Sequence, residues 1–147
     1  ERDPAAARAW YRKSAEAGVR RAMDRLAYLL AHGVGGPRDR TEAVRQARRA
    51  TRLGSRLGRA YLGTFFLRGW GGLPIDVATG RTLLRKSAKA GSSFACTELA
   101  LLLRRSQGNP KTVTSLLRRA ASLGSERAHH LLAGREDPSP WGGSAPR

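Results

Sequence analysis

A seven-residue segment recurs along the chain at intervals typical of a helical repeat. Residues 12–18 read Arg-Lys-Ser-Ala-Glu-Ala-Gly, and residues 85–91 differ from them only by Lys in place of Glu. Related segments end at Gly54 and Gly124, so the four closing glycines lie 36, 37 and 33 residues apart. A repeat of this length is a small unit that buries its apolar face only against its neighbours. We therefore expect an array of stacked units.

The residues after each closing glycine predict an amphipathic helix. Position 4 is small, position 8 is leucine, position 9 is small, and positions 11 and 12 are bulky in the first three units. The first unit shows the pattern as Ala22, Leu26, Ala27 and the pair Leu29-Leu30. These offsets fall on one face of a helix with 3.6 residues per turn. The small residues should let the next helix approach closely.

A glycine-rich break and a second helix follow. Gly33 and Gly69 suit the left-handed position that ends a helix, and Asp39 and Asp76 suit the N-cap of the next one. Asp39 with Glu42 has the spacing of a capping box. The remaining second helices open with a capping residue followed by proline, as Asp3-Pro4 and Asn109-Pro110.

These signals divide the chain into units. The expected units cover residues 4–18 (a second helix alone), 19–54, 55–91, 92–124 and a partial 125–134. Residues 135–147 are rich in proline and glycine and are expected to be a disordered basic tail. The chain starts at Glu1 without methionine, which suggests a fragment or processed product.

This combination resembles the Sel-1-like repeat, a branch of the tetratricopeptide-like α-solenoids. The resemblance rests on the small-x-x-x-Leu-small helix, the Gly-x-Gly-x-Pro-x-Asp-like loop and the Lys-Ser-Ala-x-Ala-Gly-like box, and it covers about residues 4–134. It implies an all-α, right-handed α-α superhelix whose first helices line a concave binding face. It also implies a non-enzymatic scaffold or adaptor that binds protein partners.

The resemblance also assigns candidate partner-binding residues. If the family's geometry holds, the concave face carries the first-helix residues that point away from the core. By offset these are Arg21, Asp24, Tyr28, His32, Thr64, Arg68, Thr97, Arg104, Arg105, Arg127 and His130. Arginines recur along this strip, where guanidinium groups could clamp carboxylates or phosphates. The alternative is an ordinary solvated face.

The net charge of +17 favours an anionic partner. Arginine supplies most of the cations, and the competing explanation is a compositional bias that places arginine at any tolerant exposed position. An acidic protein is our first hypothesis. Nucleic acid, RNA above all, is the alternative, although no dedicated nucleic-acid motif or recurring aromatic platform is present. Docking to an acidic membrane is least favoured, because the apolar helix faces are needed for packing.

Catalytic and metal-binding patterns are missing from the sequence. Adjacent His129 and His130 diverge on a helix and cannot share a metal as an i, i+4 pair would. Cys96, the only cysteine, is expected to be a buried, inert thiol. We therefore expect no enzyme activity, cofactor, metal or small-molecule substrate. The longest apolar runs are too short to span a membrane and no signal-like segment is present, so we expect a soluble protein in an unknown compartment.

The tryptophans lie outside the repeat pattern and receive separate predictions. Trp10 is expected to pack between helices. Trp70 replaces Val34 of the preceding repeat in a loop, where it is a candidate exposed contact. Trp141 lies in the tail, either as a docking motif or without a role.

Overall fold

The computed structural model describes residues 3–137, and within that range the chain is helical with no strand. The helices are α1 (Pro4–Glu16), α2 (Arg20–His32), α3 (Arg40–Arg52), α4 (Arg56–Arg68), the 3-10 turn η1 (Trp70–Gly72), α5 (Val77–Lys89), α6 (Ser93–Arg105), α7 (Pro110–Ser122) and α8 (Glu126–Leu132).

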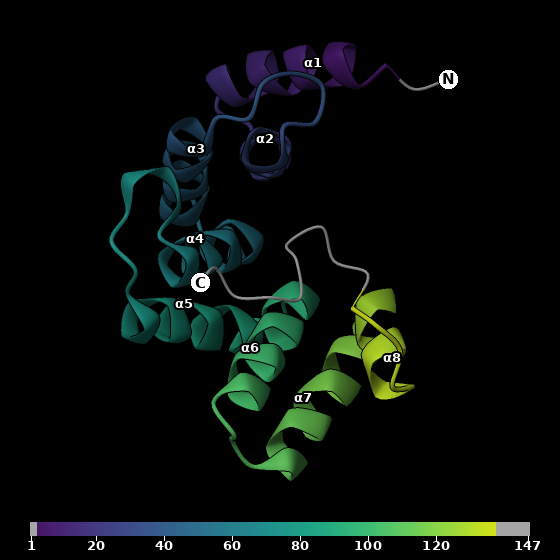
Figure 1. Ribbon diagram of the computed structural model, residues 1–147. Coiled ribbons are helices and arrows are strands. Elements are labelled where there is room, and N and C mark those ends of the chain that lie inside the picture. Colours follow the sequence, from purple (N-terminus) through teal and green to yellow (C-terminus); the bar gives the residue numbers. More distant parts are fainter. Residues whose placement is uncertain (1–2, 138–147) are drawn as a thin grey trace.

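The helices form hairpins that stack in sequence order. α2 packs on α3, α4 on α5 and α6 on α7, and each hairpin packs on the next. Figure 1 shows that the stack curves: α2, α4, α6 and α8 line its inner side, and α1, α3, α5 and α7 form its outer side. This arrangement confirms the predicted all-α superhelix. Because each hairpin packs on the next in the same way, residues at one offset recur as a row along the stack.

The caps predicted from sequence begin the second helices α1, α3, α5 and α7 and end the first helices α2 and α4. The side chains of Asp39 and Asp76 each accept a 3.0 Å bond from the backbone N–H three residues later. Gly33 and Gly69 adopt left-handed φ values of 67° and 65°. The capping box is only half realised, because the Glu42 carboxylate instead accepts a bond from Gln46 Nε2 and pairs with Arg45.

Two glycines allow the first and second helices of one unit to meet closely. A methyl group on Gly80 of α5 would lie 2.8 Å from the carbonyl oxygen of Gly63 on α4, and also 2.8 Å from side-chain carbons of Leu67. On Gly63 it would lie 3.0 Å from the Gly80 carbonyl oxygen. These distances confirm the role predicted for small residues on the inner helix faces.

The last helix departs from the expected pattern. α8 ends at Leu132, and Leu131 is buried while Leu132, in register with Leu26, is 39% exposed. Of the predicted tail, residues 135–137 are described and follow α8 without helix, whereas residues 138–147, including Trp141, lie outside the described part.

The packing predicted for Trp10 is wrong. The side chain is 62% exposed on the outer surface of α1 and contacts Tyr11 edge-on, with the ring centroids 5.2 Å apart. The helix face that packs on α2 carries smaller groups, among them the fully buried Ala15. Tryptophan at this position therefore does not contribute to the core.

Candidate functional site

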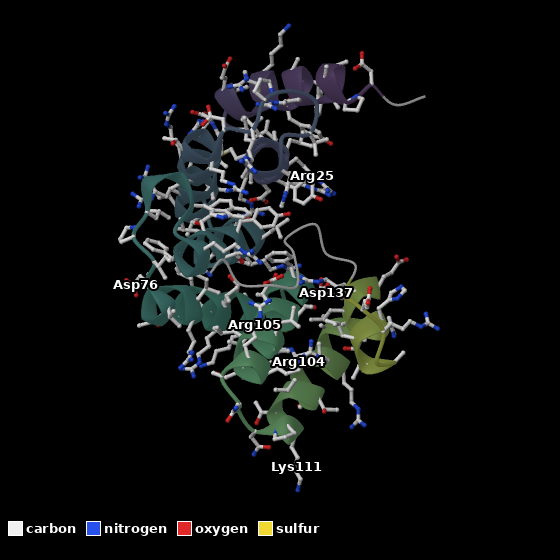
Figure 2. The ribbon with its side chains drawn as sticks, viewed as in Figure 1. Arg25, Asp76, Arg104, Arg105, Lys111 and Asp137 are labelled. Atoms are coloured by element: carbon white, nitrogen blue, oxygen red, sulfur yellow. The ribbon has the colours of Figure 1, made fainter. Side chains whose placement is uncertain are left out.

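The concave side of the stack carries several, though not all, of the predicted contact residues. Figure 2 shows Arg25, Arg105 and Asp137 on this side, whereas Asp76 and Lys111 lie elsewhere on the stack. Arg25 sits one helical turn after Arg21 on α2, and both side chains are exposed. Tyr28 and His32 continue the row toward the end of the helix and are half-buried.

An aromatic row runs across three repeats beneath this surface. The rings of Tyr28 and Tyr61 lie 6.3 Å apart, and those of Tyr61 and Phe94 meet edge-on at 5.0 Å. Tyr61 is only 7% exposed, and burial raises the pKa of its hydroxyl group. The row therefore joins neighbouring repeats and leaves Tyr61 unavailable as a flat stacking platform for bases.

Trp70 anchors the loop after α4 instead of projecting from it. Its ring stacks on Phe65 with the centroids 5.9 Å apart, and the guanidinium carbon of Arg40 lies 3.6 Å from the ring centre. His32 meets the same ring edge-on at 6.1 Å. Burial, together with the charges of Arg40 and Arg68, lowers the pKa of His32 to about 4. His32 is consequently a neutral member of this cluster at physiological pH.

Three predicted contact residues are buried, which corrects their assignment to an open face. Asp24, Thr64 and Thr97 are 7%, 1% and 1% exposed. Asp24 and Thr97 lie six residues after a closing glycine, and this offset faces the serine that caps the next first helix. The Ser55 hydroxyl lies 2.8 Å from both carboxylate oxygens of Asp24, and the hydroxyl groups of Thr97 and Ser125 lie 3.3 Å apart. Asp24 and Thr97 therefore join neighbouring repeats, whereas the Thr64 hydroxyl donates to the Ala60 carbonyl oxygen within α4.

The strongest electrostatic feature of the concave side is a carboxylate held by Arg127. Nε and Nη2 of Arg127 donate to Oδ1 and Oδ2 of Asp137 at 2.6 and 2.7 Å, and Nη1 donates to Glu98 on α6. Although burial alone would lower the pKa of Arg127, these two carboxylates raise it. Arg127 is therefore a fully charged guanidinium whose two edges both meet carboxylates.

Two further arginines belong to the same cluster. Burial lowers the pKa of Arg68, and the charges of Glu98, Arg105, Arg127 and Asp137 all act on it. Arg105, at the matching position of the next repeat, is exposed. Three guanidinium groups and two carboxylates thus form one electrostatic cluster on α4, α6, α8 and the segment that follows α8.

Two of the remaining candidates lie apart from this cluster. Arg104 is exposed and lines a separate pocket of about 600 Å³ with α7 residues such as Val113 and Leu117. His130 is half-buried near the end of α8. Sequence reasoning missed Arg25 and Glu98, which share the offset of seven residues after a closing glycine. Their spacing could have identified them, because residues 3, 7, 10 and 14 positions after a closing glycine lie on one face of a helix.

A second arginine row lies on the outer helices. The residue six positions before each closing glycine is an exposed arginine in every repeat: Arg12, Arg48, Arg85 and Arg118. On α3 this row borders a shallow pocket of about 320 Å³ between the helix and the loop Gly71–Leu73, lined also by Arg45, Arg49 and Arg52. The outer face therefore offers polyanions a positive charge that is repeated from unit to unit.

The other chemistry-bearing groups are few. Cys96 is fully buried, and this burial raises the pKa of its thiol, as the sequence predicted for an inert cysteine. Over residues 3–137 no group of three His, Cys, Asp or Glu side chains is placed to hold a metal ion. No helix in the same range has the length and apolar character needed to cross a membrane.

The comparison with known families agrees with this geometry. The sequence profile of the Sel1 repeat matches residues 1–19, 20–55 and 57–92. The chain belongs to the Sel1 repeat family. Sel1 repeats are generally non-catalytic scaffolds for protein–protein interaction. Among curated proteins, none matches the chain.

Two solved structures share the fold. A Sel1 repeat protein from Oxalobacter formigenes is 25% identical with a TM-score of 0.77, and the match covers 86% of this chain and 51% of that one. The protein c5321, a protective antigen of uropathogenic Escherichia coli with an SLR fold, is 28% identical with a TM-score of 0.65. That match covers 86% of this chain but 28% of c5321. The chain thus spans about half of the first protein and under a third of the second.

Proposed function

We propose that this chain is a non-enzymatic adaptor whose concave side binds an acidic segment of a protein partner. The observation that carries the proposal is the bidentate pairing of Arg127 with the Asp137 carboxylate on that side. Paired N–H groups of arginine match the two oxygens of a carboxylate in spacing and charge. Arg25, Arg68 and Arg105 extend the positive surface along neighbouring repeats, so that an extended acidic segment would meet several guanidinium groups in succession.

RNA binding is the second candidate, and a different surface supports it. The outer row Arg12, Arg48, Arg85 and Arg118 places one exposed guanidinium on each repeat, which suits a phosphate backbone. The concave side suits RNA less well, because Tyr61 is buried and Glu98 and Asp137 add negative charge there. The adaptor function therefore predicts binding on the concave side, and the RNA function predicts binding on the outer side.

One experiment separates them with matched variants. The concave variant Arg25→Glu with Arg105→Glu and the outer variant Arg48→Glu with Arg85→Glu replace the same number of exposed arginines. Fluorescence anisotropy would measure the binding of labelled ten-residue oligoglutamate and labelled ten-nucleotide oligouridylate at low and moderate salt. The adaptor hypothesis expects oligoglutamate binding to fall in the concave variant and to persist in the outer variant.

The converse results are equally informative. Equal loss of oligoglutamate in both variants would mean that net charge alone attracts it, and the adaptor proposal would then fail. Strong oligouridylate binding that disappears only in the outer variant would favour the RNA function. A protein captured by the unmodified chain at moderate salt counts as a partner only if the concave variant loses it and the outer variant keeps it.

A further inference from the structure

The contact between Arg127 and Asp137 joins a helix to the non-helical segment that follows it. Arg127 lies in the first turn of α8, and its Nη1 donates to Glu98, which is buried on α6. Asp137 follows α8 in a segment without helix, ten residues beyond Arg127. The Glu98 carboxylate is therefore held by a packed helix, whereas the Asp137 carboxylate lies in a segment without helix.

The cluster around the Asp137 carboxylate keeps an excess of positive charge, because Arg68, Arg105 and Arg127 outnumber Glu98 and Asp137. Its side chain is 9% exposed and that of Arg127 is 15% exposed, so both charges are largely removed from solvent. The Asp137 charge also acts on Arg68, where it favours the charged form and so raises the pKa. Without the Asp137 charge, the cluster would hold three guanidinium groups and the single carboxylate of Glu98.

Glu98 fixes the orientation of the guanidinium. It accepts from Nη1, which leaves the Nε and Nη2 edge directed at Asp137. A planar guanidinium held at one edge by a rigid carboxylate presents a preformed fork at the other. Any carboxylate that replaced Asp137 would meet this fork without further ordering of Arg127.

We propose that the Arg127 fork is a carboxylate subsite for the acidic partner, and that Asp137 fills it as an internal competitor until a partner side chain displaces it. This inference rests on the proposed adaptor function. Binding then requires the fork to be open, and the apparent affinity equals the intrinsic affinity multiplied by the fraction of molecules in which the fork is open. If Asp137 fills the fork in about nine molecules of ten, its removal strengthens binding about tenfold.

The test uses the full chain, Asp137→Asn, and a control with the same change of charge. Glu42→Gln is the matched control, because Glu42 pairs with Arg45 at 2.5 Å on the outer helix α3. Both variants free one arginine from one carboxylate, but only Asp137→Asn does so on the concave side. Labelled oligoglutamate at moderate salt should bind Asp137→Asn about tenfold more tightly than the unmodified chain, and Glu42→Gln should change binding less than about twofold.

A third variant ties the gain to the fork. Adding Arg127→Gln to Asp137→Asn should return the affinity to that of the unmodified chain or below it. Equal gains in Asp137→Asn and Glu42→Gln would overturn the inference, as would a gain that survives Arg127→Gln. A lower thermal midpoint in Asp137→Asn with unchanged binding would show that the pair only braces α8, and it would also overturn the inference.

The proposed function can survive that outcome. If Asp137→Asn binds oligoglutamate like the unmodified chain while Arg25→Glu with Arg105→Glu still abolishes binding, the concave side remains the acidic-segment surface and only the internal competitor is lost. If none of the concave variants affects binding, the adaptor proposal and the subsite fail together.

Discussion

Replacing Ser55 by alanine tests whether the buried Asp24 contact joins the first two complete repeats. The Ser55 hydroxyl has two roles: it accepts a 2.9 Å bond from the Gly58 N–H at the start of α4, and it donates to Asp24 on α2. Ser92 is a natural control. It caps α6 by accepting from the Ala95 N–H at 3.1 Å, but the residue in the preceding repeat at the Asp24 position is Ala60.

The two contacts give different expected losses. Removing a serine N-cap destabilises a protein by about 1 kcal/mol. Leaving a buried charged group without its hydrogen-bond donor adds about 1.5–3 kcal/mol. Ser55→Ala should therefore lower the free energy of unfolding by about 3 kcal/mol, whereas Ser92→Ala should lower it by about 1 kcal/mol.

Urea unfolding followed by far-UV circular dichroism measures both losses. In an Asp24→Ala background, Ser55→Ala should cost only the cap, so the double-mutant cycle isolates the contact between repeats. Asp24 supplies a second readout: burial raises its pKa and the Ser55 bond opposes that rise, so Ser55→Ala should raise the pKa of Asp24 further. Equal losses for Ser55→Ala and Ser92→Ala, with no shift in the Asp24 pKa, would refute the reasoning.

Three further predictions concern single positions. Gly80→Ala should lower the free energy of unfolding by about 1 kcal/mol, because overpacking against the Gly63 carbonyl exceeds the gain in helix propensity. Gly63→Ala should lower the free energy of unfolding by less, and a Gly80→Ala variant more stable than the unmodified chain would contradict the close approach of the two helices. Arg8→Gln should cost about 1–2 kcal/mol, since its guanidinium donates to the Pro37 carbonyl at 2.7 Å, while the exposed Arg12→Gln should change little. The pKa of His32 is about 4 in the folded chain against 6.5 in the unfolded chain, so the unfolded state binds this proton first. The free energy of unfolding should therefore lose nothing through His32 above pH 6.5 and should fall as the pH drops from 6.5 to 4. An NMR titration midpoint for His32 near pH 6.5 would contradict this.

The helical hairpins were predictable because their signals are local. Closing glycines, N-cap aspartates and small residues at fixed offsets act within one turn or between adjacent helices, and the structure places each of them accordingly. The third repeat shows how such a signal can be replaced. Where Ser106 stands in place of the helix-ending glycine, Gln107 adopts a left-handed φ of 56° and completes the turn. A non-glycine residue at this φ is uncommon, so sequence alone would not have chosen it.

The candidate surface was only partly predictable because the offsets were read from a single helix. On an isolated first helix, Asp24 and Thr97 point away from the core formed with the second helix. Stacking of the next repeat then covers that side, and a capping serine meets it. Glu98 was not among the predicted contact residues, because its role depends on Arg127 of the next repeat, which the sequence of its own helix does not reveal.

Part of the positive charge has a structural role, which bears on the choice between function and compositional bias. Four arginines donate to carbonyl oxygens at or just beyond the C-terminal ends of second helices, where the helix dipole favours a cation. These bonds run from Arg20 to Leu53, from Arg56 to Ala90, from Arg49 to Ala15 and from Arg119 to Lys89. A net charge of +17 is therefore not in itself a sign of an anionic partner. The arginines that indicate an anionic partner are those beside side-chain carboxylates on the concave side. Arg127 has the most complete set of such contacts.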